Sequence, residues 1–175
     1  WVSRRMLINV EQGTVNPSLG TLLKLSDALG LGLPMLVGTP EPGVPTLTPA
    51  GEGADLWTGE AGGRGTLLAG TEAPNVLELW EWVLEPGERW STDGDAAGTR
   101  EVLQVHDGTT TVQVRDEVFT LSIGDTLALP GDVPHSYANL EAATTRFSLA
   151  VSEPGVGTDR RPNLAEPSNQ PGVLR

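Results

Sequence analysis

The sequence contains no cysteine among its 175 residues and only two histidines. The absence of cysteine excludes disulfides, thiolate metal ligands and a cysteine nucleophile. No run of 18 apolar residues could form a transmembrane helix, and no charged segment precedes an apolar stretch as in a signal peptide. We therefore predict a cytoplasmic protein with no membrane partner. With so few histidines, no nucleophile–histidine–acid combination stands out, and we expect no catalytic residues and no enzyme.

Turn-forming residues are abundant. The chain has 22 glycines and 14 prolines, about a fifth of its length, which favours a turn-rich fold over a helical bundle. The first residue is Trp1, and a helix-like pattern starts there without a lead-in. We therefore expect the chain to be truncated at its N-terminus.

The acidic charge is concentrated in one part of the chain. The net charge of −12 argues against nucleic acid as a partner, because acidic groups repel phosphate. Residues 1–40, however, carry Arg4, Arg5 and Lys24 against only Glu11 and Asp27. Any contact with DNA has to come from this nearly neutral part.

Residues 1–37 show helical patterns. Ser3 can cap a short helix that ends at Gly13. Residues 16–18 (Asn-Pro-Ser) start a second helix, whose cap is either the asparagine or the serine and whose stop is Gly30. One further turn is expected at 33–37.

After a linker rich in proline and glycine (38–54), the apolar period changes to two, which is typical of β-strands. With no helical pattern between the strands, we predict an antiparallel all-β sandwich or barrel. The proline-rich residues 153–175 are predicted to be a disordered tail. About eight strands are expected, at 65–70, 76–86, 100–106, 109–114, 117–121, 125–130, 135–139 and 145–151.

The N-terminal pattern V-S-x-x-x-L-x-x-x-E-x-G-x-x-x-P-S-L-x-T-L starts at Val2. It resembles the lambda-repressor-like helix-turn-helix of XRE-type transcriptional regulators, beginning at the third of the usual five helices, the recognition helix. The resemblance implies that residues 1–37 are a partial DNA-binding domain that lacks two supporting helices. We therefore expect this chain to bind DNA weakly or not at all, and a longer parent protein to bind double-stranded DNA.

The resemblance also implies which residues meet DNA. A recognition helix inserts its N-terminal side chains into the major groove, where Arg reads guanine and Asn reads adenine. Arg4, Arg5 and Asn9 are the expected base readers, and Ser3 and Asn16 are expected to touch phosphates. From the residues alone, two arginines on a helix could equally be a solvated face.

Two later motifs resemble those of a small cupin barrel, the double-stranded β-helix that is fused to some XRE-type regulators. The first motif spans 86–108, and the second runs from Gly124-Asp125 to Pro134-His135. The resemblance implies an effector-binding barrel over residues 55–152.

In metal-binding cupins the two motifs supply three histidines and a glutamate. Here Trp90 and Asp95 fall at two histidine positions, while Glu101 and His135 are kept. Asp95, Glu101 and His135 are thus weak candidates for a divalent metal, and no cofactor is expected. His135 has two further interpretations, a neutral histidine bonded within the barrel and a contact to a ligand without metal. The expected effector pocket comprises Trp90, Asp95, Glu101, Leu103, His135 and Tyr137.

Two details of the barrel stay open at this point. Trp80, Trp82 and Trp90 could form the aromatic wall of a pocket or belong to the barrel core. Glu101 lines the cavity if the strand that it begins turns that face inward, and Arg100 then points outward.

The predicted function is a DNA-binding transcriptional regulator, acting as a homodimer, whose cupin domain senses a small-molecule effector. The alternative is a metal-dependent cupin enzyme of the dioxygenase or isomerase type, against which Trp90 at a histidine position speaks. A binding module without a DNA role is a third possibility.

Overall fold

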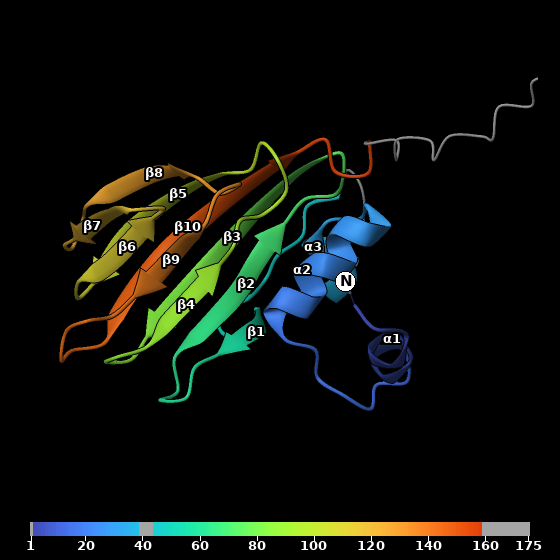
Figure 1. The fold of residues 1–175 in the computed structure, drawn as a ribbon, viewed down its shortest axis with the longest axis horizontal. Helices are drawn as coiled ribbons and strands as arrows, with labels where there is room; N and C mark the ends of the chain where they lie inside the picture. Colours follow the sequence, from blue (N-terminus) through green and yellow to red (C-terminus); the bar gives the residue numbers. More distant parts are fainter. Residues whose placement is uncertain (1, 39–43, 159–175) are drawn as a thin grey trace, which may run out of the picture.

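The computed structural model describes residues 2–38 and 44–158. In this part of the chain three helices precede ten strands (Figure 1). None of the described helices is long and apolar enough to cross a membrane. The helices are α1 (Arg4–Glu11), α2 (Leu19–Leu29) and α3 (Leu33–Val37), and the strands are β1 (Ala54–Thr58), β2 (Arg64–Gly70), β3 (Asn75–Leu84), β4 (Arg89–Thr92), β5 (Arg100–Asp107), β6 (Thr110–Val114), β7 (Glu117–Leu121), β8 (Thr126–Pro130), β9 (His135–Ala138) and β10 (Thr145–Pro154).

The helices begin and end where the capping residues predict. The Ser3 side chain accepts a hydrogen bond from the Met6 N–H, and the Ser18 side chain accepts one from Thr21. Ser18 rather than Asn16 is therefore the cap of α2. Gly30 ends α2 in the left-handed conformation, with φ of 63°, which glycine adopts at little cost.

The helices differ in how they contact the barrel. α1 contains no buried residue and lies apart from the strands, whereas α2 and α3 lie beside the end of the barrel (Figure 1). Leu19 and Leu33 belong to the barrel's hydrophobic core, and Leu22 and Leu23 pack against it. The barrel therefore covers the apolar side of α2.

Two antiparallel sheets form the barrel. The six-stranded sheet has the order β1-β2-β3-β10-β5-β8, and the four-stranded sheet has the order β4-β9-β6-β7. β10 lies between β3 and β5 and pairs with both along most of its length. Side chains of both sheets meet in one core, as expected of an all-β barrel.

The strand alternation places apolar side chains between the sheets. On β3, Trp80 and Trp82 are 3% and 1% exposed, and Trp82 lies parallel to Phe147 of β10 with ring centroids 6.2 Å apart. Trp80 and Trp82 therefore belong to the barrel core rather than to the wall of a pocket.

The observed boundaries correct some of the expected ones. The prediction of about eight strands missed β1 and β4, two of the ten strands in the described residues. β1 starts at Ala54, inside the expected linker, and β10 runs to Pro154, so Glu153 is a buried strand residue rather than part of a tail. The expectations for Trp1, for residues 39–43 of the linker and for residues 159–175 of the tail lie outside the described residues.

Candidate functional site

One end of the barrel interior is acidic. Glu78 of β3 and Glu101 of β5 both pair with Val151 of the strand between them, so all three side chains share the inner face. Glu153 lies two residues further along β10 on that face. Glu78 and Glu101 are 2% exposed and Glu153 is 5% exposed. Buried carboxylates are costly unless something neutralises or binds them.

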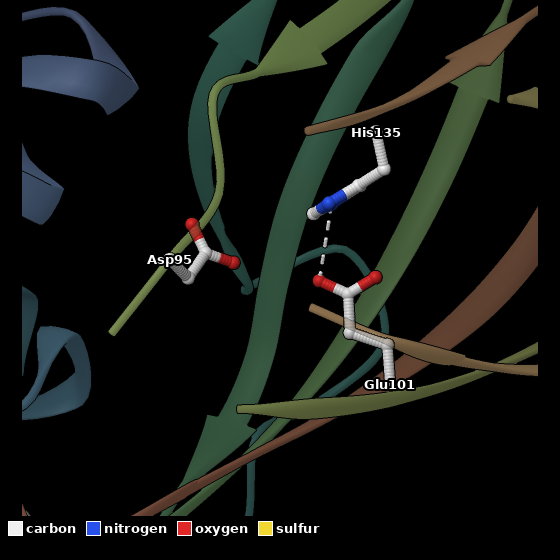
Figure 2. A group of neighbouring side chains, drawn as sticks. All are labelled: Asp95, Glu101 and His135. Atoms are coloured by element: carbon white, nitrogen blue, oxygen red, sulfur yellow. Dashed lines mark ion pairs between the residues drawn. The ribbon is translucent and has the colours of Figure 1, made fainter. Parts of the chain in front are cut away.

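Asp95 and His135 form a cluster with Glu101, which is 2% exposed because the alternation of β5 turns it inward. Asp95 lies in the loop between β4 and β5, and its backbone N–H donates to the Gly131 carbonyl at 2.9 Å. His135 is the first residue of β9. The three side chains converge from three elements (Figure 2), and one ligand atom of each lies within 4.8 Å of the other two.

The His135 imidazole is held in one orientation. Its Nδ1 lies 2.8 Å from the Val133 carbonyl oxygen, and since a carbonyl only accepts, Nδ1 carries a proton. The buried Nε2 lies 3.3 Å from Glu101 Oε1, but without the geometry of a hydrogen bond. If the imidazole is neutral, Nε2 carries a lone pair that lies close to the negatively charged Glu101 Oε1. Such an arrangement needs a proton or another cation between the two atoms.

Aromatic side chains support Glu101 from the core. The hydroxyl of the fully buried Tyr137 donates to Glu101 Oε2. Trp90 stacks on the Tyr137 ring, with centroids 5.4 Å apart and planes at 12°. Leu103, the next inward residue on β5, is fully buried in the core. Of these three residues of the expected pocket, Tyr137 contacts Glu101 directly and Trp90 packs on Tyr137. Their contact with an effector stays a prediction.

The acidic groups raise one another's pKa. Burial, followed by repulsion from Glu153, raises the pKa of Glu78 to about 8. Burial, followed by repulsion from Glu101, raises the pKa of Asp95 to about 7. Burial, with Asp27 and Glu101 nearby, raises the pKa of Glu153 to about 7. Carboxylic acids with such pKa values are partly protonated at neutral pH, as expected where acidic groups are buried close together.

The charge of the cluster favours a proton on His135. Burial lowers the pKa of this imidazole, but the contact with Glu101 and the bond to Val133 outweigh that effect, so the pKa is raised. Burial and the adjacent Glu101 raise the pKa of Tyr137 well above 10. Tyr137 therefore stays protonated and remains a donor to Glu101.

A cavity of about 330 Å³ lies between α2 and the β4–β5 loop. Leu23, Lys24 and Asp27 of α2 form one wall, and Asp95 and Glu153 belong to the opposite side. Because Asp95 also belongs to the cluster with His135, the cavity adjoins that cluster.

The cluster fits a divalent metal in its donor set. Asp95 and Glu101 offer carboxylate oxygens, and His135 offers a buried Nε2 without a hydrogen bond while its Nδ1 is anchored on a backbone carbonyl. One imidazole and two carboxylates suit a hard or borderline ion with open positions. Such an ion would supply Lewis-acid chemistry at the cluster.

Residues 80–152 match the Cupin domain family. The barrel has the cupin fold. An HTH_3 family transcriptional regulator from Vibrio cholerae has a similar structure, with a TM-score of 0.64 and 24% identity over 87% of this chain and 82% of that chain. This likeness shows the fold.

Other solved cupins are more distant. The Cupin_2 domain of an XRE family transcriptional regulator from Enterobacter cloacae gives a TM-score of 0.42 and 24% identity, over 43% of this chain and 79% of that chain. A sugar phosphate isomerase of the cupin superfamily from Silicibacter pomeroyi gives 0.43 and 19%, over 53% and 60%. No curated protein matches the chain.

The residues expected to contact DNA lie outside the cupin domain. Arg4 and Arg5 are exposed in the first turn of α1, and Asn9 is half-buried one turn later. Asn16 is exposed in the turn before α2. The Ser3 hydroxyl caps α1 by accepting from Met6. Their contact with DNA stays a prediction.

Sequence reasoning missed the acidic end of the cupin domain. Glu78 and Asp27 belong to no motif, and Glu153 is the first residue of the expected tail. Alternation along β3 could have found Glu78, since it shares its face with Trp80 and Trp82. Asp27 and Glu153 meet only through the packing of α2 on the barrel, which no local pattern shows. His106 is exposed, and its Nε2 lies 2.7 Å from Ser148 Oγ.

Proposed function

We propose that the protein is a DNA-binding transcriptional regulator whose cupin domain binds a small-molecule effector. The observation that carries this proposal is α1, a Ser3-capped helix with two exposed arginines in its first turn and no buried residue. A helix that contributes nothing to the core is free to enter a DNA groove. The similar fold of the Vibrio cholerae regulator supports the same function.

In the proposed complex, Arg4 and Arg5 read guanines and Asn9 reads adenine, while Ser3 and Asn16 approach phosphates. The acidic cupin domain stays away from the duplex because its charge repels phosphate. The effector binds next to Asp95, Glu101 and His135. Effector binding then biases the affinity for DNA, as linkage requires when two sites are coupled.

The test is selection of genomic fragments by this chain and by a longer form that also supplies the two front helices. We expect the longer form to enrich a two-fold-symmetric site, with an affinity that falls steeply with salt. Arg5→Ala should weaken binding by about tenfold or more, whereas Arg64→Ala, at an exposed position on the barrel, should not. No enriched site with a folded protein would overturn the DNA-binding function. Equal affinity of both forms would overturn the expected need for the front helices.

We also propose that two copies pair through the outer face of the six-stranded sheet. Successive ladder partners there form an apolar row across five strands, in which Leu79 is 44% and Val102 is 47% exposed. A continuous exposed apolar row is typical of an interface, and a two-fold site on DNA needs a two-fold protein. The row consists of Ala69, Leu79, Ala150, Val102 and Ala128.

Sedimentation of the Leu79→Arg variant tests this pairing. We expect the wild type to sediment as a dimer and the variant as a monomer. The matched control is Val118→Arg, which places the same charge at a 62% exposed position on β7 and should remain dimeric. If the Leu79→Arg protein remains a dimer, the interface does not lie on this face.

The second candidate function is a metal-dependent cupin enzyme. The cluster of Asp95, Glu101 and His135 favours it, because three ligand atoms lie within 4.8 Å of one another and His135 Nε2 has no hydrogen bond. Mass spectrometry of the purified protein tests it. One equivalent of metal in the wild type and none in His135→Ala would favour this candidate, whereas no bound metal in the wild type would argue against it.

A further inference from the structure

The loop between β8 and β9 holds two of the three members of the cluster. Its Gly131 carbonyl accepts a hydrogen bond from the Asp95 N–H at 2.9 Å, and its Val133 carbonyl oxygen lies 2.8 Å from His135 Nδ1. Asp95 and His135 come from different elements, the β4–β5 loop and β9. The placement of both groups relative to Glu101 therefore depends on this one short loop.

Asp132 of the same loop binds the β4–β5 loop through its side chain. Its Oδ2 accepts from the Gly98 N–H at 2.8 Å, and its Oδ1 lies 3.5 Å from Arg100 Nη1. We call these two contacts the Asp132 latch. The bond to Gly98 contributes more, because a charged acceptor strengthens a hydrogen bond. The Arg100 side chain is 62% exposed, and an exposed ion pair contributes little.

The β4–β5 loop has two glycines at which its backbone bends. Gly94 and Gly98 have φ of 117° and 90°, which glycine adopts far more readily than other residues. A Cβ at Gly94 would lie 3.0 Å from the Asp132 carbonyl carbon, so the two loops pack backbone to backbone. Between the glycines stand Asp95 and two alanines, none of them buried. A segment with so little buried surface opens at low cost once its hydrogen bonds are lost.

This segment covers the other two members of the cluster. Glu101 is 2% exposed, and the His135 side chain has no exposed surface. Asp95 is the member of the cluster that lines the cavity beside α2. Figure 2 shows Asp95 between the helices and the Glu101–His135 pair. The way from that cavity to the pair therefore leads past Asp95.

We propose that Asp132 is a positioning residue, whose latch holds residues 94–98 over the Glu101–His135 pair, and that release of the latch admits a ligand to this pair. When the latch is formed, Asp95 completes the cluster and the pair is closed to solvent. When the latch is released, the segment swings about its glycines and the pair becomes accessible. The inference rests on the proposed function, because it names the step that regulates access to the effector site.

The two histidines of the chain provide the test, because His135 is buried in the cluster and His106 is exposed. Diethyl pyrocarbonate acylates accessible, unprotonated imidazoles, and mass spectrometry of peptides reports each histidine separately. In the wild type we expect fast acylation of His106 and slow acylation of His135. Asp132→Ala should acylate His135 about fivefold faster or more, the effect of one lost hydrogen bond on the opening of the segment. The rate at His106 should not change.

Asp125→Ala is the matched control. Asp125 Oδ2 accepts from the Ser122 N–H at 2.8 Å in the turn between β7 and β8. This variant loses the same kind of bond away from the cluster and should acylate His135 like the wild type. Asp132→Asn keeps an acceptor for Gly98 but not the charge, so its rate should lie between those of the wild type and Asp132→Ala. Melting temperatures establish that each variant is folded, and Asp132→Asn replaces Asp132→Ala if the latter does not fold.

Amide exchange separates the latch from a general structural role of Asp132. We expect Asp132→Ala to quicken exchange in residues 93–99 and to leave β3, β5 and β10 unchanged. Unchanged exchange in 93–99, or unchanged acylation of His135 in a folded variant, would overturn the latch. Faster exchange throughout the barrel would overturn it as well, since Asp132 would then support the whole fold.

Failure of the latch and failure of the proposed function have different signatures. If the longer form enriches no DNA site while acylation of His135 depends on Asp132, the latch stands and the regulator is overturned. If the longer form enriches a site while acylation of His135 does not depend on Asp132, the regulator stands and the latch is overturned.

Discussion

The two ends of the barrel interior contrast in chemistry although they share the same three strands. Toward one end, successive inward rows hold Trp80, Leu149 and Leu103, then Trp82, Phe147 and Val105. Toward the other end, the rows hold Glu78 and Glu101 on either side of Val151, and then Glu153. The alternation that buries side chains is identical in both, so the fold does not require the acidic residues.

The contrast separates stability from function. The apolar rows release water on folding and supply most of the stabilising free energy. The acidic rows oppose folding because each buried carboxylate loses its hydration. A cost that the fold does not need is typical of a binding site, where stability is given up for affinity.

The largest effect is expected at the apolar end. Trp82→Ala removes a ring whose centroid lies 5.4 Å from those of both Trp57 and Trp90. The cavity left behind should lower the free energy of unfolding by about 3–5 kcal/mol. Urea unfolding measures the loss, and Trp82→Phe, which keeps a ring, should cost clearly less. If Trp82→Ala loses less free energy of unfolding than Trp82→Phe, the apolar end is not the main source of stability.

A buried carboxylate with partners should behave in the opposite way to one without. Glu88 is 8% exposed and accepts from the N–H groups of Ala61 at 2.7 Å, Gly63 at 3.3 Å and Glu85 at 2.8 Å. Glu88→Gln replaces an acceptor by a donor facing N–H groups and should destabilise the protein by about 1–3 kcal/mol. Thermal unfolding of Glu88→Gln and of Glu117→Gln, an exposed control, measures it. If Glu88→Gln leaves the stability unchanged, buried carboxylates with and without hydrogen-bond partners have the same effect on the free energy of unfolding.

Glu78→Gln should stabilise the protein at pH 8 and have little effect at pH 5. The folded-state pKa of Glu78 is raised from 4.5 to about 8, so the folded protein holds a proton that the unfolded chain releases between these values. Stability therefore falls as the pH rises from 5 to 8. The neutral amide removes this loss, and we expect a gain on the order of 1–3 kcal/mol at pH 8. Urea unfolding at both pH values checks it, and a pH profile identical to that of the wild type would contradict it.

The smallest effect is expected at the helical wall of the acidic cavity. Ser18→Ala removes the cap that accepts from the Thr21 N–H at 3.3 Å, which should cost about 1 kcal/mol, confined to α2. Amide exchange should quicken in residues 19–29 and stay unchanged in β3, β5 and β10. Ser152→Ala, on an exposed strand position, is the control. Uniformly faster exchange would show that α2 and the barrel open together.

Local patterns in the sequence were enough to predict most of the fold. The cap at Ser3 and the stop at Gly30 depend on neighbouring residues alone, and the structure confirms them, while it chooses Ser18 from the two caps that the sequence offered for α2. Period-two alternation found the long strands, including β3 and β10. It missed β1 and β4, which contain no buried residue, and a register shift between Asp55 and Trp57 also interrupts the alternation of β1.

The candidate site was only partly predictable, because it depends on which strands are neighbours. The motif around Pro134-His135 pointed to His135, whereas the alternation from Glu101 left open whether that face of its strand turns inward. That Glu78 lies across β10 from Glu101 follows from the strand order, which places the last strand between β3 and β5. No pattern within one segment carries that information.

The central position of β10 has a consequence for synthesis. β3 ends about 60 residues and β5 about 40 residues before β10 begins, so both strands are synthesised before the strand that pairs with them. Until then, each has an unpaired edge with Trp80, Trp82 or Leu103 beside it, a surface on which another nascent chain can add a strand. Insertion of the final strand into the middle of the sheet is therefore the step at which the protein escapes aggregation, and crowded translation is the condition under which it is most vulnerable.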